Sequence, residues 1–224
     1  TLQMKALQAQ MNPHFMHNAL NSIQDFITSR ESAKAAKYLA KFARLIRQSL
    51  EYSDQEVISL EEEVAFLENY LRINQVLRFN EKMDYRVEVS DELEEDFMGV
   101  PAMIVQPYVE NAIEHGIRSL EKGGMVTLHF SLHDENNILC TIEDNGIGRQ
   151  KAAELQRRSS HYRTHRSMGT QITRDRLELL HKKQQTQIEG PHVEIVDLHD
   201  DQNQPRGTRI RVIIPVMPLD TTFA

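Results

Sequence analysis

The spacing of the apolar residues changes partway along the chain, and this change sets the fold class. Between residues 2 and 52 the apolar positions recur every three or four residues, which is typical of amphipathic helices. From Met83 onward they alternate with polar residues, which is typical of half-buried strands. The sequence therefore predicts an α+β protein with a helical start and a strand-rich remainder.

The helical part is expected to be a hairpin of two helices, over residues 2–29 and 33–52. The apolar residues of the second helix are Ala35, Leu39, Phe42, Ile46 and Leu50. A lone hairpin buries too little apolar surface to be stable, so we expect two copies to pair as a four-helix bundle. This predicts a homodimer.

A polar stretch at residues 53–56 marks the expected boundary between two domains, 1–53 and 54–224. Immediately after it, residues 57–58 read as a short strand. Ser59 and Glu62 then form a capping box that begins a new helix. The apolar positions of that helix are Leu60, Val64, Leu67 and Leu71.

The second domain reads as an α/β sandwich. Strict alternation over residues 83–89, 126–132 and 208–212 predicts a mostly antiparallel sheet with one solvent-facing side. Helical segments from about 101 to 116 and from about 168 to 183 should cover the other side.

Composition excludes several classes of protein. The chain has 224 residues, a net charge of −7 and one cysteine, Cys140, which rules out an internal disulfide and any multi-cysteine metal site. No apolar run is long enough to span a bilayer. The acidic balance argues against nucleic-acid binding. One segment differs, because residues 149–166 hold six basic residues and one acid, which suits a small polyanion.

The first candidate ligand-binding motif is the run from Asp144 to Gly148, which follows the predicted strand 138–143. Gly146 and Gly148 would let the backbone turn tightly and approach a ligand. By itself this run is as well explained by an ordinary turn.

The preceding helix carries Asn111 and His115, which are four residues apart and share a helix face. Their amide oxygen and imidazole are suited to a magnesium ion and a phosphate, respectively. For His115, a place in the helix C-cap before Gly116 is an equally good explanation.

Two further motifs complete the pattern. Ser167 and Gly169 lie where the basic segment meets the start of a helix, and free backbone N–H groups there favour an anion. Gly207 and Thr208 enter the last predicted strand.

In this order, the motifs resemble the Bergerat ATP-binding fold over residues 55–216. The resemblance implies that Asp144 accepts a hydrogen bond from the adenine amino group and that Asn111 ligates Mg²⁺. It also implies that Gly146 and Gly148 wall the base pocket, and that residues 149–168 form a lid over the phosphates. We expect that lid to be mobile without nucleotide.

A second resemblance comes from the N-terminal run Gln10-Met11-Asn12-Pro13-His14-Phe15-Met16-His17-Asn18-Ala19-Leu20-Asn21. It is similar to the signature of LytS/YehU-type sensor histidine kinases, and Gln106-Pro107 with Glu110-Asn111 fits the same branch. The resemblance implies that ATP phosphorylates His14 and that the phosphoryl group passes to an aspartate of a response regulator. It further implies the cytoplasmic portion of an inner-membrane sensor, and the chain reads as part of a longer protein.

The residues around His14 agree with that role. Pro13 lacks an N–H group and disfavours helix at Asn12, so His14 lies where a helix restarts or kinks. A helix N-terminus disfavours the imidazolium and leaves a neutral, nucleophilic ring. His17 competes for the role, and a histidine packed in a bundle core beside a kink is the plain structural alternative.

The chain departs from the family pattern in ways that keep other functions open. Ser167 and Thr170 replace the usual glycine and leucine of the glycine-rich segment. This departure supports, as an alternative, a catalytically weak pseudokinase that acts as a nucleotide-binding dimeric scaffold. The residue after His14 is Phe15 rather than an acid, so the sequence names no general base. A conformational ATPase is disfavoured, because Pro107 occupies the position of the acid that activates water.

Overall fold

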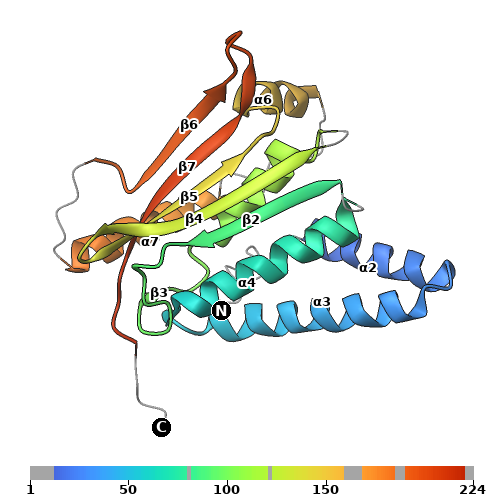
Figure 1. Ribbon diagram of the computed structural model, residues 1–224, viewed down its shortest axis with the longest axis horizontal. Coiled ribbons are helices and arrows are strands. Elements are labelled where there is room, and N and C mark those ends of the chain that lie inside the picture. The colour runs from blue at the N-terminus through green and yellow to red at the C-terminus, as the bar shows by residue number, and fades with distance from the viewer. Residues whose placement is uncertain (1–12, 80–81, 121–122, 159–167, 185–189, 220–224) are drawn as a thin grey trace.

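The computed structural model describes residues 13–79, 82–120, 123–158, 168–184 and 190–219 (Figure 1). Its first two helices, α2 (Pro13–Thr28) and α3 (Ser32–Ser53), form the predicted hairpin. Arg30 adopts a left-handed backbone with φ of 61° in the turn between them. The part of the predicted first helix that precedes Pro13 lies outside the described residues.

The inner face of the hairpin packs on its own chain. The Phe15 ring lies 5.1 Å from that of Tyr70, and the Tyr52 ring lies 5.9 Å from that of Phe66. Both partners belong to α4 (Leu60–Ile73). The expectation that the hairpin lacks a partner within the chain is therefore wrong for this face, because the core continues without a break from hairpin to sheet.

The predicted apolar stripe of α3 is only partly buried. Leu39 and Leu50 are 47% and 52% exposed, whereas Phe42 is buried. The buried face is rotated toward Tyr38 and Leu45. Four large apolar side chains of the hairpin remain exposed, which we call the hairpin stripe: Leu20 and Ile27 on α2, and Leu39 and Leu50 on α3.

The segment after the hairpin forms as expected. Strand β1 (Val57–Ser59) leads into the capping box, in which the Ser59 hydroxyl accepts from the Glu62 N–H at 3.1 Å. The Glu62 carboxylate accepts from the Ser59 N–H at 2.9 Å. All four predicted apolar positions of α4 are buried. The helix ends in a π-helical turn, η1 (Asn74–Arg78).

The main sheet has the strand order β2-β4-β5-β7-β6. These strands are β2 (Met83–Val89), β4 (Gly124–Asp134), β5 (Asn137–Asp144), β6 (Val193–His199) and β7 (Pro205–Pro215). Only β2 and β4 pair in parallel, which confirms the mostly antiparallel sheet. The open face carries ion pairs between neighbouring strands, such as Arg209 with Glu143 at 2.9 Å. Strand β6 was not predicted.

The helices of the second domain cover one face of this sheet. Figure 1 shows α7 (Met168–Gln184) on the same face as α5 (Gln106–Asn111) and the π-helical turn η2 (Ala112–Ile117). The helix predicted from 101 begins only at Gln106. Pro101 instead lies in β3 (Gly99–Pro101), which pairs with β1.

A buried carboxylate explains why the α5 helix starts late. The Glu63 side chain accepts hydrogen bonds from the Met103 and Val105 N–H groups at 2.9 and 3.1 Å. Met103 also has a φ of 57°, which is outside helical geometry. These bonds fix an irregular turn where the periodicity alone indicated helix. Across the described ranges, none of the helices has the length and apolar character needed to cross a membrane.

Candidate functional site

The candidate site centres on Asp144, the last residue of β5. Asp144 pairs with Thr208 of β7 in the sheet register and is only 3% exposed. Its Oδ1 accepts the Gly146 N–H at 2.9 Å. Gly207 is needed beside it, because its φ is 130° and a Cβ there would stand 1.8 Å from the Asp144 carbonyl oxygen. The end of β5 thus holds one buried carboxylate, with Gly207 packed against its backbone.

Two glycines bring the helix and the loop together over this carboxylate. A Cβ on Gly116 would stand 2.3 Å from Asp144 Oδ1, and one on Gly146 would stand 2.3 Å from the Gly116 backbone. The Ile147 N–H also donates to the Gly116 carbonyl at 3.3 Å. The sequence indicates Gly116 only as a helix end and does not reveal its steric role. The one sequence feature that points to a close contact here is a glycine directly after His115.

Burial changes the acidity of Asp144. The pKa of Asp144 is raised to about 6, mainly by loss of hydration and in smaller part by the nearby Glu143 charge. Hydrogen bonds from the backbone of Gly146 and Thr208 act in the opposite direction. At neutral pH the group is mostly ionised and can accept a hydrogen bond from an amino group.

Gly148 lies on the far side of the loop. Its φ is 76°, and a Cβ there would stand 2.9 Å from Pro205 Cβ. Both loop positions therefore require glycine for steric reasons. A side chain at Gly146 would meet the helix, and one at Gly148 would meet the start of β7.

The two polar residues of the helix lie on either side of a change in helix type. Asn111 ends α5 and His115 lies in the π-helical turn η2, and both are half-buried. π-helical turns are rare and occur often at functional sites. The turn packs on β4 and β5, so it holds this end of the helix against the Asp144 loop.

A buried ion pair fixes the same turn from the other side. Arg78 Nη1 lies 2.5 Å from Glu114 Oε1, and both side chains are more than nine-tenths buried. Arg78 also donates to Asn74 Oδ1 at 3.0 Å. The pair ties η1 to η2, and it was not predicted because its partners are distant in the sequence.

The basic segment begins as a helix rather than a loop. Residues Arg149–Arg158 form α6, and Arg149 donates two hydrogen bonds of 2.7 Å to Asp197 of β6. Gly169 is the second residue of α7, and no described atom outside its own helical turn would lie within 4 Å of a Cβ there. Residues 159–167 of the predicted lid, which include Ser167, lie outside the described residues.

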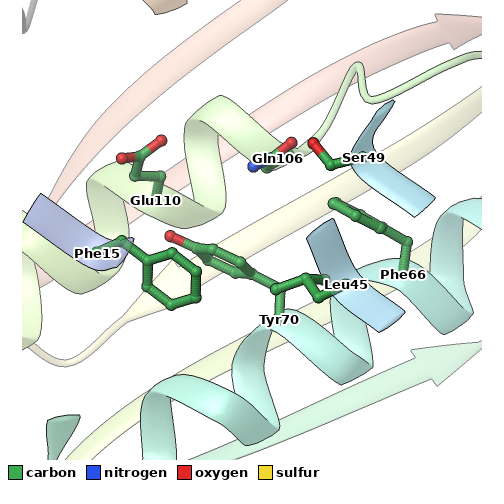
Figure 2. Close-up of a pocket in the computed structure, with 7 residues that line it drawn as sticks. All are labelled: Phe15, Leu45, Ser49, Phe66, Tyr70, Gln106 and Glu110. Atoms are coloured by element: carbon green, nitrogen blue, oxygen red, sulfur yellow. The ribbon is translucent and has the colours of Figure 1, made fainter. Parts of the chain in front are cut away.

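The proposed acceptor lies in the first turn of α2. Its neighbour Phe15 is buried against Phe42 and Tyr70, with ring centroids 6.0 and 5.1 Å away. Figure 2 shows a small pocket here, where α2, α3, α4 and α5 meet; it is lined by Phe15, Leu45, Ser49, Phe66, Tyr70, Gln106 and Glu110. Helix α2, which carries His14 in its first turn, therefore packs beside the helix that carries Asn111. The side chain of His14, together with Asn12, is outside the described residues, and His17 is exposed.

The residues present fit a nucleotide better than a resident metal ion. Within the described ranges, no group of three or more His, Cys, Asp or Glu side chains could hold a metal ion. Mg²⁺ commonly keeps several waters and takes only one or two protein ligands beside the phosphates of a nucleotide. A single amide such as Asn111 suits that role, and the buried Asp144 suits an amino group.

Two protein-family models match the chain. The histidine kinase model matches residues 2–83. The model of the histidine kinase-, DNA gyrase B-, and HSP90-like ATPases matches residues 101–218, more than half of the chain.

Curated relatives point the same way. The chain is similar to the sensor histidine kinase YpdA of Escherichia coli, with 32% identity over 146 residues, which is 65% of this chain and 25% of YpdA. It is also similar to the sensor protein LytS of Oceanobacillus iheyensis, with 32% identity over 146 residues, 65% of this chain and 24% of LytS. The chain thus spans about a quarter of the length of these relatives.

Among solved structures, a mycobacterial sensor histidine kinase, MprB, aligns over 73% of this chain and 99% of its own, with 18% identity and a TM-score of 0.45. The resemblance to LytS-type sensor histidine kinases is confirmed by the family models and the curated relatives. The chain belongs to the family of histidine kinase-, DNA gyrase B- and HSP90-like ATPases.

Proposed function

We propose that this chain is the kinase portion of a sensor histidine kinase, which binds Mg-ATP and phosphorylates its own His14. The observation that supports this most is the buried Asp144 carboxylate, held beneath Gly116 and Gly146 at the end of β5. A carboxylate that is desolvated yet mostly ionised at neutral pH is a specific acceptor for an adenine amino group. Helix α2, which carries His14 in its first turn, packs against the same domain.

Each site residue then has a role. Asp144 accepts from the adenine amino group, and Thr208 lies opposite it in the sheet. Gly146 and Gly148 keep the loop close to the base. Asn111 would ligate Mg²⁺, which would neutralise the charge of the phosphates, and His115 would contact a phosphate. Ser167 and Gly169 would bind phosphate oxygens at the start of α7.

The main contribution of the protein to phosphoryl transfer is to position the acceptor and the nucleotide. Phosphoryl transfer needs an attacking atom in line with the leaving oxygen and little covalent help from the protein. The position four residues before Asn111 holds Pro107, which cannot activate water. This favours transfer to His14 over hydrolysis.

Further features follow from this function. We propose that residues 1–53 and 54–224 act as the acceptor domain and the ATP-binding domain. The acceptor hairpin would pair with a second copy through its exposed stripe of Leu20, Ile27, Leu39 and Leu50. The phosphoryl group would pass to an aspartate in the receiver domain of a response regulator. This chain would face the cytoplasm as part of a larger inner-membrane sensor.

Incubation with γ-labelled ATP and Mg²⁺ tests the proposal. The protein should acquire a label that survives alkali and is lost in acid, because phosphohistidine is a phosphoramidate. Asn111→Ala should abolish the label through loss of the metal. A protein that binds ATP but never becomes labelled would instead be a nucleotide-binding scaffold.

A further inference from the structure

Two π-helical turns lie between the candidate nucleotide site and the acceptor helix. The turn η1 continues α4, and its Phe79 N–H donates to the Asn74 carbonyl five residues back, at 3.2 Å. The turn η2 continues α5, and the Arg118 N–H donates to the Ile113 carbonyl in the same pattern, at 2.9 Å. Such turns are rare and often mark functional sites. In this protein the two turns are also joined to each other.

The side chains that join the two turns are buried. Arg78 of η1 forms an ion pair with Glu114 of η2 at 2.5 Å, and the exposed fractions of the two side chains are 5% and 7%. Arg118 lies 3.2 Å from the other oxygen of the same carboxylate. A buried ion pair holds its two elements in one relative position, because any shift that separates the charges leaves them desolvated without a partner.

On the side of η2, the ion pair reaches the candidate nucleotide site. Glu114 directly precedes His115 and Gly116 in the chain. The Ile147 N–H of the loop after β5 donates to the Gly116 carbonyl, and a Cβ on Gly116 would stand 2.3 Å from Asp144 Oδ1. This packing is so close that a shift of η2 must also move the loop that holds Asp144.

On the side of η1, the ion pair reaches the acceptor helix α2 by two routes. The Ser22 hydroxyl of α2 donates to the carbonyl of Leu77, the residue before Arg78, and Figure 1 shows α2 beside the end of α4 that η1 continues. Arg78 also donates to Asn74 Oδ1, and the Asn74 amide donates to the Tyr70 carbonyl at 2.9 Å. The ring of Tyr70 packs against α2. The position of α2 therefore depends on η1.

We propose that Arg78 is a positioning residue for transfer to His14: through Glu114 it sets where the acceptor helix lies relative to the bound nucleotide. This inference rests on the proposed function. Arg78 takes no part in the bonds that form and break. Transfer requires the attacking atom to be aligned with the phosphorus, and a misplacement of about 1 Å can cost about 100-fold in rate. The same contacts act in the other direction, so a nucleotide that orders η2 should also order α2.

The first measurement is the rate of labelling of His14 at saturating Mg-ATP. Arg78→Met is combined with Glu114→Leu, because loss of Arg78 alone leaves a buried carboxylate whose remaining partner is the more exposed Arg118. The rate should fall by about 100-fold in this double variant. Its affinity for Mg-ATP should be unchanged, because the proposed nucleotide contacts are retained. Arg78→Lys keeps a charge beside Glu114 and should lose less of the rate.

The second measurement separates positioning from a purely structural role. In the wild type, a non-hydrolysable ATP analogue with Mg²⁺ should slow hydrogen exchange severalfold in the Asp144 loop and in α2. In the double variant the analogue should slow exchange in the Asp144 loop but not in α2. Arg78→Lys should keep the response of α2. A general loss of stability would speed exchange with and without the analogue and would not remove the response of α2 alone.

Arg211→Gln with Glu194→Gln is the matched control, since this half-exposed ion pair joins β7 to β6. It should change neither measurement. An unchanged rate of labelling in the double variant would overturn the role of Arg78. So would a response of α2 to the analogue that is equal in both proteins, or absent from the wild type. A wild type that acquires no label on His14 would contradict the proposed function, and the exchange comparison would still decide whether Arg78 couples the two sites.

Discussion

The backbone of Gly116 lies so close to Gly146 that a Cβ on Gly146 would stand 2.3 Å from the Gly116 carbonyl carbon. This contact joins the end of the η2 turn to the loop after β5. It also closes the space above Asp144, whose Oδ1 would lie 2.3 Å from a Cβ on Gly116. Any side chain at these two positions must push apart the helix and the loop that form the candidate ATP site.

Gly146→Ala should therefore destabilise the protein and weaken nucleotide binding together. A methyl group forced against backbone typically costs about 1–3 kcal/mol. Gly169→Ala is the contrast for stability, because no described atom outside its own helical turn lies within 4 Å of a Cβ there and alanine favours a helix. Thermal unfolding should show a lower midpoint for Gly146→Ala and not for Gly169→Ala. Equal midpoints for the two variants would mean that the glycine contact is not needed.

Asp144→Asn should bind ATP about tenfold or more weakly, since a charge-assisted hydrogen bond contributes roughly 1.5–3 kcal/mol. The ligand-free variant should be more stable than the wild type at neutral pH, because burial of the charge raises the pKa of Asp144 to about 6 from 3.8. A shift of this size corresponds to a cost of about 3 kcal/mol for the ionised form. Calorimetry and thermal unfolding measure the two effects.

The pH dependence of ATP affinity distinguishes contact between Asp144 and adenine from a purely structural role of Asp144. In the wild type, Asp144 becomes protonated as the pH falls through about 6, so it loses the negative charge that strengthens its hydrogen bond from the adenine amino group. The ratio of wild-type to Asp144→Asn affinity should shrink over that range. The stability difference should shrink as well, because both proteins then carry a neutral group. A constant ratio would remove Asp144 from contact with the base.

Short motifs in the sequence mark the candidate site residues Asp144, Asn111 and Thr208, whose roles stay predictions. The contacts that support these residues in the fold have no such motif. The Arg78–Glu114 pair joins residues whose proximity depends on how η1 packs against η2, so no local pattern reveals it. The late start of α5 likewise depends on Glu63, which reaches it from another helix.

Tertiary packing also determines which face of the hairpin is buried within the chain. The periodicity of the sequence predicts an apolar stripe through Leu39 and Leu50, but it does not predict which neighbouring element covers that stripe. In the structure the single chain supplies Tyr70 and Phe66 for the inner face. The sequence could not distinguish contact within the chain from contact with a second copy, because both require the same apolar pattern.

Glu63 should make stability depend on pH. Its burial raises the pKa of Glu63 to about 7 from 4.5, against the opposing hydrogen bonds from Val105 and Met103. Between these values the folded protein holds a proton that the unfolded chain releases. The free energy of unfolding therefore falls as the pH rises from 4.5 toward 7. The slope from this group is at most about 1.4 kcal/mol per pH unit.

Denaturant unfolding of wild type and Glu63→Gln across this range tests the assignment. The stability of the wild type relative to the variant should decline as the pH rises. Glu68→Gln, an exposed change on the same helix, should give a difference that does not vary with pH. A flat difference for Glu63→Gln would show that Glu63 ionises in the folded protein as it does in water.

The exposed hairpin stripe should hold two copies together. Leu39→Glu with Leu50→Glu places charges among side chains that are 47% and 52% exposed in the single chain. Burial of such charges between two copies without partners is strongly unfavourable. Light scattering should show a dimer for the wild type and a monomer for the double variant. Arg44→Glu adds acidic charge on an exposed part of α3 away from these leucines and should remain a dimer.

The central claim is that the ATP-binding domain of this chain phosphorylates His14. After incubation with γ-labelled Mg-ATP and digestion under alkaline conditions, mass spectrometry should find the phosphoryl group on the peptide that contains His14. His14→Gln should carry no acid-labile label while it binds ATP with unchanged affinity, because the proposed nucleotide contacts lie on α5 and the Asp144 loop. Persistent acid-labile label in His14→Gln, with His17 as the first alternative, would contradict the account.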